Sequence, residues 1–351
     1  GDDLVRVFFA LINEVFDGGA DIDTLDVSNE TAAYTIDLSG VDAEFVQFAT
    51  FRNFENVIGT ALGDTITGSA GANTINAGAG VDIVNAGDGD DIIIDDDASN
   101  SGLETLNGGD GDDIFRVTPV NSGNYDGGAG NDTIDLSTNV DEYSGAEAIN
   151  LSLAAFVNGS RFAGFENAIG SVFGDDIIGS DGANILDGHF GADTIDGGAG
   201  DDIITDRDGA ADAIDGGADD DTIIVHNAQG DTYEGGQGVD TLDLSNESAG
   251  YTLADTVDLA AAFFTKGAAQ FSGFENVIGT NQADVIAGSG VANALNGGGG
   301  ADIVSGGGGG DVLTDSDGAG IDALLGEAGD DIIRVFAAIA GETFDGGAGD
   351  T

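Results

Sequence analysis

Aspartates that recur at nine-residue intervals are the residues of this chain best suited to chemistry. Residues 197–205 read Gly-Gly-Ala-Gly-Asp-Asp-Ile-Ile-Thr and show the full unit, Gly-Gly-x-Gly-x-Asp-x-apolar-x. The sixth position offers a carboxylate, and the glycines allow a tight turn that brings main-chain carbonyl oxygens close to it. Carboxylate and carbonyl oxygens form an environment suited to a hard cation, above all Ca²⁺. The repeated aspartates therefore predict a series of calcium sites.

The unit occurs 21 times in phase along the chain. Its eighth position is apolar in all 21 copies, and its sixth position is Asp in 17 of them. The departures are Asn73, Asn184, Asn293 and Glu104 at the sixth position, and Ser99, Arg207 and Asp317 at the first. Because the phase persists across insertions of varied length, we interpret the aspartates as ligands in a structural repeat, not only as turn-forming residues.

The elements that must position these aspartates are short strands. The last three residues of each unit form a strand that buries one side chain, which is too little to fold alone. Stacking solves this if each strand pairs in parallel with the strand two units further on, about 4.8 Å away. The eighth-position side chains then form an internal ladder. We therefore predict an all-β fold, a parallel β-roll or β-helix solenoid built of nine-residue turns, with interspersed coils that lack the calcium turn.

A longer period of about 110 residues groups the units into modules. The segment Phe-Glu-Asn-x-Ile-Gly starts at Phe54, Phe165 and Phe274, which are 111 and 109 residues apart, and we expect it to pack in the core. We predict one continuous solenoid in four parts: residues 1–58 as the end of a preceding module with spacer coils, 59–169 and 170–278 as modules with spacers, and 279–351 as a truncated module. Because both ends interrupt a repeat, we expect the chain to be part of a longer array.

The composition favours multivalent cations as partners and excludes other classes. Asp and Glu number 66 against 7 Lys and Arg, which gives a net charge of −59. This charge repels nucleic acid and anionic lipid, so we expect neither as a partner. No apolar stretch is long enough to span a membrane, and we expect no direct membrane insertion. The chain has no Cys, so packing or metal must hold it together.

The charge also predicts how the chain folds. One Ca²⁺ in each of the 21 units would bring 42 positive charges and change the net charge from −59 to −17. Without metal, the carboxylates repel one another and the glycines raise the entropy cost of ordering the chain. We therefore expect a chain that is largely disordered without calcium and that folds when calcium binds.

Two further groups of polar residues are candidates for metal binding or catalysis. An Asp-x-Asp insertion follows the fourth unit of each module, at residues 95–97, 206–208 and 315–317, and it fits either an additional calcium site or a solvated loop. His189 and His226 are the only histidines, and neither has a Ser, Cys or second His at a useful spacing. The sequence therefore predicts no enzyme activity.

The repeated units resemble the RTX family, the haemolysin-type calcium-binding β-roll. The long modules resemble those of large secreted bacterial surface or matrix proteins. The resemblance implies that sixth-position aspartates supply the side-chain ligands and turn carbonyls the rest, with roughly one Ca²⁺ per intact turn. By resemblance, the metal ligands are Asp23, Asp64, Asp82, Asp91, Asp113, Asp132, Asp175, Asp193, Asp202, Asp212, Asp221, Asp240, Asp284, Asp302, Asp311, Asp322 and Asp331.

The resemblance and the modules together predict a calcium-binding structural repeat segment of a large secreted bacterial protein, such as a surface layer, an extracellular filament or matrix, or an adhesin stalk. We expect it to lie outside the cell or on its surface, to stiffen on calcium, and to associate with itself or continue into further repeats. Two alternatives stay open. One is a folding and secretion module of an exported enzyme or toxin. The other is binding of an acidic polysaccharide through bridging calcium, as in the R-modules of alginate epimerases, which the units also resemble.

Overall fold

Short strands dominate the part of the chain that the structure describes. The computed structural model describes residues 1–8, 14–39, 43–44, 49–95, 104–118, 123–138, 148–152, 156–157, 160–246, 256–261, 264–266, 269–316, 318 and 320–349, and the statements below concern these residues. They contain 38 strands and no helix. The strands build a parallel β-solenoid of about 14 turns, which confirms the predicted fold class. The chain divides into two compact units, Gly1–Asp176 and Ile177–Thr351. The four-part division into modules stays a prediction.

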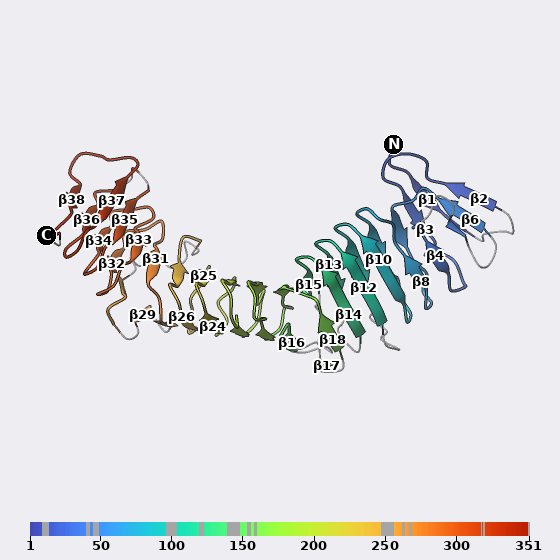
Figure 1. Cartoon of the computed structure of the whole chain (residues 1–351), viewed down its shortest axis with the longest axis horizontal. Coiled ribbons are helices and arrows are strands. Elements are labelled where there is room, and N and C mark those ends of the chain that lie inside the picture. The colour runs from blue at the N-terminus through green and yellow to red at the C-terminus, as the bar shows by residue number, and fades with distance from the viewer. Residues whose placement is uncertain are drawn as a thin grey trace. The chain divides into compact units, whose positions relative to one another are not determined.

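The first unit has two main faces, each a row of parallel strands, and a smaller sheet near its N-terminus. The first face runs through β1 (Leu4–Arg6), β3 (Thr24–Asp26), β7 (Asn56–Ile58), β9 (Thr74–Asn76), β11 (Ile92–Asp95), β13 (Ile114–Val117), β15 (Thr133–Asp135) and β19 (Asn167–Ile169). The second face runs through β4 (Thr35–Asp37), β8 (Thr65–Thr67), β10 (Ile83–Asp88), β12 (Glu104–Asp110), β14 (Gly123–Ala129), β18 (Ser160–Ala163) and β17 (Phe156–Val157). The smaller sheet holds β2 (Glu14–Asp17), β6 (Ala49–Arg52) and β5 (Ala43–Glu44). One further strand, β16 (Ala148–Asn150), also belongs to this unit. Figure 1 shows β8, β10, β12 and β14 side by side.

The second unit repeats this arrangement. Its first face holds β21 (Ile185–Asp187), β23 (Ile203–Asp206), β25 (Thr222–Val225), β27 (Thr241–Asp243), β31 (Asn276–Ile278), β33 (Ala294–Asn296), β35 (Val312–Asp315) and β37 (Ile332–Val335). Its second face is split. One row holds β20 (Asp176–Ile178), β22 (Thr194–Asp196), β24 (Ala213–Ala218), β26 (Thr232–Gln237), β30 (Ala269–Ser272) and β29 (Phe264–Lys266). The other holds β28 (Thr256–Asp258), β32 (Val285–Ala287), β34 (Ile303–Ser305), β36 (Ala323–Leu325) and β38 (Thr343–Asp345).

The core is a ladder of eighth-position side chains. Ile93 of β11 lies opposite Ile75 of β9 on one side and Phe115 of β13 on the other, so each strand pairs with the strand two units away. All three side chains are 0% exposed. Burying one such side chain contributes about 1.5–3 kcal/mol. The predicted internal ladder is therefore confirmed.

The spacers add aromatic packing and antiparallel pairs. Tyr125 stacks on Phe162 with ring centroids 5.5 Å apart, and Tyr233 stacks on Phe271 at 4.9 Å. The marker residues Phe54, Phe165 and Phe274 are buried, as predicted. At the ends of their rows, β17 pairs antiparallel with β18, and β29 with β30. The nine-residue pattern does not predict these antiparallel strands.

No helix among the described residues is long and apolar enough to cross a membrane.

Candidate metal centre

The sixth-position side chains point into the solenoid because of strand alternation. Residues two apart in an extended segment point to the same side. The eighth position must point inward to build the core, and the sixth position therefore points inward as well. Asp91 and Asp113, two positions before Ile93 and Phe115, are at most 1% exposed. The sequence thus forces carboxylates into the edge of the core.

These carboxylates form a ladder on the first face of each unit. The main-chain N–H of Asp91 donates to Oδ1 of Asp113 (2.8 Å), and that of Asp113 donates to Oδ1 of Asp132 (2.8 Å). In the second unit, Asp202 donates to Asp221 and Asp221 donates to Asp240, both at 2.9 Å. We call the full set the first-face ladder. Its members are Asp23, Glu55, Asn73, Asp91, Asp113, Asp132 and Glu166 in the first unit, and Asn184, Asp202, Asp221, Asp240, Glu275, Asn293, Asp311 and Asp331 in the second.

The second oxygen of each ladder aspartate is buried without a hydrogen-bond partner. This orphaned oxygen is Oδ2 in Asp23, Asp91, Asp113, Asp132, Asp202, Asp221, Asp240, Asp311 and Asp331. A buried carboxylate oxygen without a partner is costly, and native proteins rarely keep one. Nine in a periodic row on one face indicate a group that the protein chain itself does not supply.

In eight of these nine turns the first residue is a glycine, which leaves a small space beside the orphaned oxygen, and Ala86 holds this place in the turn of Asp91. A Cβ built on Gly216 would lie 2.6 Å from Oδ2 of Asp221 and closer still to the carbonyl oxygen of Gly235. Gly197 has the same surroundings, with Oδ2 of Asp202 at 2.5 Å and the carbonyl oxygen of Gly216 closer. Each of these two turns therefore places a carboxylate oxygen close to a carbonyl oxygen from the next coil, which is the donor set that Ca²⁺ takes.

The electrostatics of the ladder also favour a cation. Burial, and next to it the like charges of neighbouring carboxylates, raise the pKa of Asp91, Asp132 and Asp202 to about 7. The same causes raise the pKa of Asp221 and Asp240 to about 6. Hydrogen bonds from the main chain oppose this shift but do not cancel it. A bound cation would favour the ionised form and lower these pKa values.

The second face carries its own ladder of sixth-position residues. Asp64 donates its N–H to Oδ1 of Asp82 (2.6 Å), and Asp284 donates to Oδ1 of Asp302 (2.8 Å). We call this set the second-face ladder. Its members are Asp64, Asp82, Glu104, Asp175, Asp193, Asp212, Asp231, Asp284, Asp302 and Asp322. All of them are buried. The two ladders together contain every predicted ligand, and all of these except Asp331 are buried.

Three second-face aspartates differ from the first-face type. Oδ2 of Asp64 accepts the N–H of Thr60 (2.6 Å). Asp175 and Asp284 accept the N–H of a Ser or Thr at the second position of the same turn in the same way, at 2.6 and 2.8 Å. Their carboxylates are thus hydrogen-bonded within their own turns.

The predicted ligand set omits one aspartate of the ladders, Asp231. Asp231 is 0% exposed, and its Oδ1 accepts the N–H of Asp212 at 2.9 Å. Its signal was present in the sequence, because Asp231 precedes the buried Tyr233 by two positions, as a sixth position precedes an eighth. Glu55, Glu166 and Glu275 were also outside the ligand set, and each accepts a ladder N–H through Oε2.

The Asp-x-Asp insertions are partly buried. Asp95, Asp206 and Asp315 are 3–5% exposed, so the first residue of each insertion is not solvated. Carboxylate oxygens of Asp206, Asp208 and Asp212 lie within 4.8 Å of one another. Asp315, Asp322 and Glu342 form the corresponding group. Asp96, Asp97, Ser99 and Asp317 lie outside the described residues.

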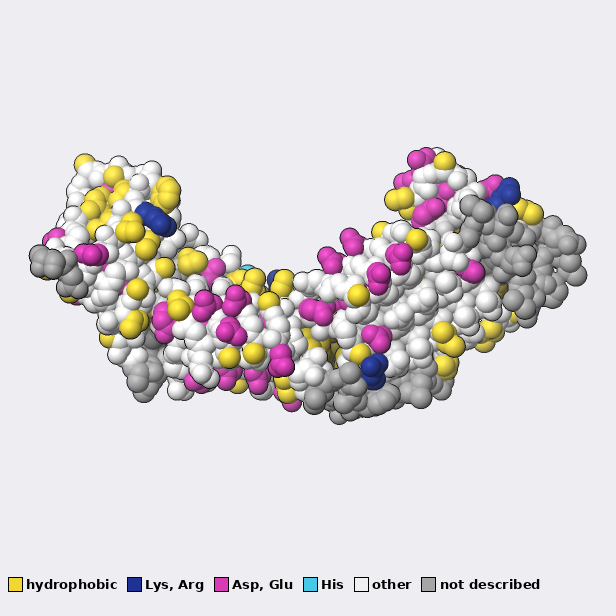
Figure 2. All heavy atoms as spheres, in the orientation of Figure 1, with side chains coloured by type: hydrophobic (Ala, Val, Ile, Leu, Met, Phe, Trp, Pro, Cys, Tyr) yellow, Lys and Arg dark blue, Asp and Glu magenta, His cyan; other side chains and the backbone are white. Residues whose placement is uncertain are grey.

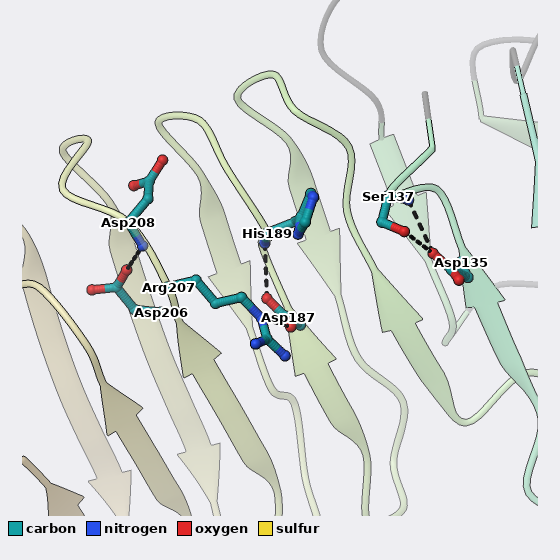
Figure 3. A network of polar contacts seen from close by, with 7 residues as sticks. All are labelled: Asp135, Ser137, Asp187, His189, Asp206, Arg207 and Asp208. Atoms are coloured by element: carbon teal, nitrogen blue, oxygen red, sulfur yellow. Dashed lines mark hydrogen bonds and ion pairs between the residues drawn. The ribbon is translucent and has the colours of Figure 1, made fainter. Parts of the chain in front are cut away.

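Local hydrogen bonds hold the insertion at residues 206–208 and the turn that contains His189, as Figure 3 shows. Oδ1 of Asp206 accepts the N–H of Asp208 at 3.2 Å, and Oδ1 of Asp187 accepts the N–H of His189 at 2.9 Å. Arg207 forms an ion pair with Asp187. His189 has a φ of 68°, in the left-handed region, so it holds the backbone position of a second glycine.

A comparison with protein-family models finds the RTX calcium-binding nonapeptide repeat (4 copies). It matches residues 58–93, 99–116, 124–146, 169–204, 278–313 and 316–335. These segments contain Asp91, Asp202 and Asp311, whereas Asp221 and Asp240 lie outside them and show the same geometry. No curated protein matches the chain.

Proposed function

We propose that this chain, which belongs to the RTX family of calcium-binding nonapeptide repeats, is a calcium-dependent structural segment. The protein that contains it would be a large secreted bacterial protein. The observation that carries this proposal is the row of buried carboxylate oxygens without partners on the first-face ladder. A calcium ion in such a turn supplies the positive charge and the oxygen coordination that the protein chain does not. Metal binding and folding are then one process.

The ligands that we propose first are the nine aspartates with an orphaned Oδ2, together with carbonyl oxygens of the glycine turns. Asp221, for example, offers Oδ2 beside the carbonyl oxygen of Gly235. We also propose five second-face ligands, only because they hold the sixth position of the family's repeat. They are Asp82, Asp193, Asp212, Asp302 and Asp322.

The charge distribution supports a structural role outside the cell. Figure 2 shows acidic side chains over the visible face of the chain and few basic ones. A net charge of −59 opposes compact folding unless cations bind, and extracellular calcium modules work with dissociation constants of about 0.1–1 mM. RTX repeats are typical of secreted bacterial proteins and are not typically catalytic. We therefore propose a surface-layer, filament, matrix or adhesin-stalk role.

The partner that we propose is another repeat, either further along the same protein or in a second copy. Phe16, Tyr125 and Tyr233 each stack on an aromatic residue of the following spacer. Phe344 holds the same place in the next module and is 39% exposed. A spacer from another repeat would cover it. Analytical ultracentrifugation at rising concentration, with the wild type against Phe344→Ser, tests this. Equal sedimentation of the two would contradict association through this end.

The central test is folding against calcium. Circular dichroism of the full chain in EGTA should show a largely disordered chain, and addition of about 1–10 mM CaCl₂ should produce the β signal. MgCl₂ at the same concentration should not, because Mg²⁺ demands a tighter octahedral site. Equal β content in EGTA and in CaCl₂ would remove the basis for the proposal. Electron microscopy of the native assembly with and without chelator then tests the structural role.

A further inference from the structure

We propose that the residue at the second position of a turn decides whether that turn takes calcium, and that the first coil of each module closes without the ion. This inference rests on the calcium-binding function proposed above and assigns its sites more narrowly. It departs from the ligand set predicted by resemblance at Asp64, Asp175 and Asp284.

A hydroxyl residue at the second position closes the turn on the second face. Thr280 donates its N–H to Oδ2 of Asp284 at 2.8 Å, and its hydroxyl lies 3.0 and 3.2 Å from the two carboxylate oxygens. Thr60 makes the equivalent bonds to Asp64, with its N–H at 2.6 Å and its hydroxyl at 3.1 Å. These bonds occupy the oxygen that is orphaned in the glycine turns. A cation at this carboxylate would have to displace them.

The turn that follows on the first face is closed as well, and its sixth-position residue is a neutral Asn. Ser289 donates its N–H to Oδ1 of Asn293 at 2.7 Å, and the amide of Asn293 donates to the carbonyl oxygen of Glu275 at 2.6 Å. Ser69 and Asn73 repeat the first bond at 2.7 Å. An amide carries no negative charge, and here its donor group occupies a carbonyl oxygen. The chain therefore provides in these turns what an ion provides elsewhere.

The remaining nine-residue turns, which we call open turns, have a different backbone. Their second residue is usually glycine with positive φ, for example 118° at Gly87, 101° at Gly198 and 94° at Gly307. A Cβ on Gly198 in this conformation would collide with the carbonyl oxygen of Ser180. The second-position Ser and Thr residues of the closed turns are not among the residues with positive φ. On the first face, all nine turns with an orphaned oxygen have positive φ at the second residue, so the residue type at this position selects the backbone conformation that leaves the oxygen without a partner.

The six closed turns recur at one place in every module. They start at Gly59, Gly68, Gly170, Gly179, Gly279 and Gly288, the first two units after each aromatic spacer. The second-position carbonyls of these turns accept hydrogen bonds from the first open turns, as Gly299 donates to Thr280 (2.8 Å) and Gly308 donates to Ser289 (2.8 Å). Each closed coil therefore presents formed acceptors on which the next, calcium-binding coil can assemble.

The test compares two triple variants of the full chain with one identical change per module. The closed set is Asp64→Asn, Asp175→Asn and Asp284→Asn. The open set is Asp91→Asn, Asp202→Asn and Asp311→Asn. Native mass spectrometry in calcium counts the bound ions. We expect the closed set to keep the wild-type number and the open set to lose at least three ions.

The outcomes separate this inference from the function on which it rests. If the closed set loses as many ions as the open set, the second position does not select and the inference is overturned. If the wild type binds no calcium, the proposed function itself fails. If both sets keep the full number of ions, the sixth-position carboxylates are not the ligands. That result would contradict the ligands named in both proposals.

A second pair of variants covers the case in which the open set does not fold. Thr280→Gly removes the closing hydroxyl and allows positive φ, and it should add one ion to the count. Gly307→Ser introduces the closing residue next to Asp311 and should remove one. No change in the count for either variant would overturn the inference.

Discussion

The main-chain N–H of Asp202 donates a 2.9 Å hydrogen bond to Oδ1 of Asp221, one coil further along the chain, and Oδ2 of Asp221 is left buried without a partner. One oxygen thus holds the coils in register while the other is available to a cation. The same division recurs along the first-face ladder of both units. Each ladder aspartate thus links the register of the coils to a position where a cation can bind.

The metal-free fold should be favoured by acid. Burial raises the pKa of Asp202 to about 7 and that of Asp221 to about 6, from an ordinary value of 3.8. A carboxyl group with a raised pKa in the fold supports folding fully below pH 3.8, and this support is lost as the pH rises through 6 to 7. We expect the metal-free chain to gain β signal in circular dichroism when the pH falls from about 8 to about 5.

Calcium affinity should move in the opposite direction over the same range, because protons compete with the ion for the carboxylates. Calcium titrations at several pH values, on chain freed of metal by a chelating resin, measure this. A metal-free chain with less β structure at pH 5 than at pH 8, or an affinity that does not change with pH, would contradict the prediction.

The change Gly217→Ala should remove a calcium site. Gly217 has a φ of 106°, and its new Cβ would lie 2.3 Å from the carbonyl oxygen of Gly198, so the turn of Asp221 would have to distort. We expect the loss of at least one ion in native mass spectrometry and a destabilisation of about 1–3 kcal/mol in urea with calcium present. Gly182→Ala is the matched control, because its Cβ would meet only the Ser180 hydroxyl, at 3.9 Å. Equal effects of the two changes would rule out this account of the second-position glycine.

Two neighbouring isoleucines should differ sharply in their contribution to stability. Ile204 is 0% exposed, whereas Ile203, one residue earlier on β23, is 41% exposed. We expect Ile204→Ala to cost about 2–5 kcal/mol of unfolding free energy and Ile203→Ala less than about 1 kcal/mol. Urea denaturation in saturating calcium measures both. Similar costs would mean that the eighth position does not form the core.

Structure that remains without calcium should lie in the closed coils. Residues 279–296 form a coil with two closed turns, and residues 297–314 form the next coil, with two open turns. In hydrogen-exchange mass spectrometry of the full chain in EGTA, we expect amides of the first segment to exchange about tenfold or more slowly than those of the second. Calcium should then protect both segments. Uniform exchange across them in EGTA would contradict the role of closed coils as a starting point for folding.

Much of the fold could be predicted because the repeat is local and periodic. The apolar eighth position and the acidic sixth position share one parity, so a single frame predicts the strand, the buried ladder of Ile93 and Phe115, and the inward carboxylates of Asp91 and Asp113. The spacers could not be predicted in the same way. Their antiparallel pairs, β17 with β18 and β29 with β30, depend on where a longer excursion returns to the sheet.

The candidate site, like the fold, could be predicted from the sequence only in part. The position of Asp221 in a ladder follows from its place in the nine-residue frame. That Oδ1 of Asp221 is bonded while Oδ2 is free could not be predicted, because the donor is the N–H of Asp202, 19 residues earlier. Asp231 was missed for a related reason. It lies outside the Gly-Gly-x-Gly units, and its place in the second-face ladder is seen from the N–H of Asp212, which donates to its Oδ1.

The sequence by itself determined the repeat frame, the solenoid and the type of ion, since these follow from residue types at fixed spacing. Only the tertiary structure decided which carboxylates are free to bind that ion. Asp284 and Asp311 occupy the same position in the repeat, yet Asp284 is closed by Thr280 and Asp311 keeps a buried oxygen without a partner. The physical reason is that Oδ2 of Asp311 is buried only when neighbouring coils pack against its turn, and its own turn then provides no donor. In the turn of Asp284, Thr280 provides that donor four residues away.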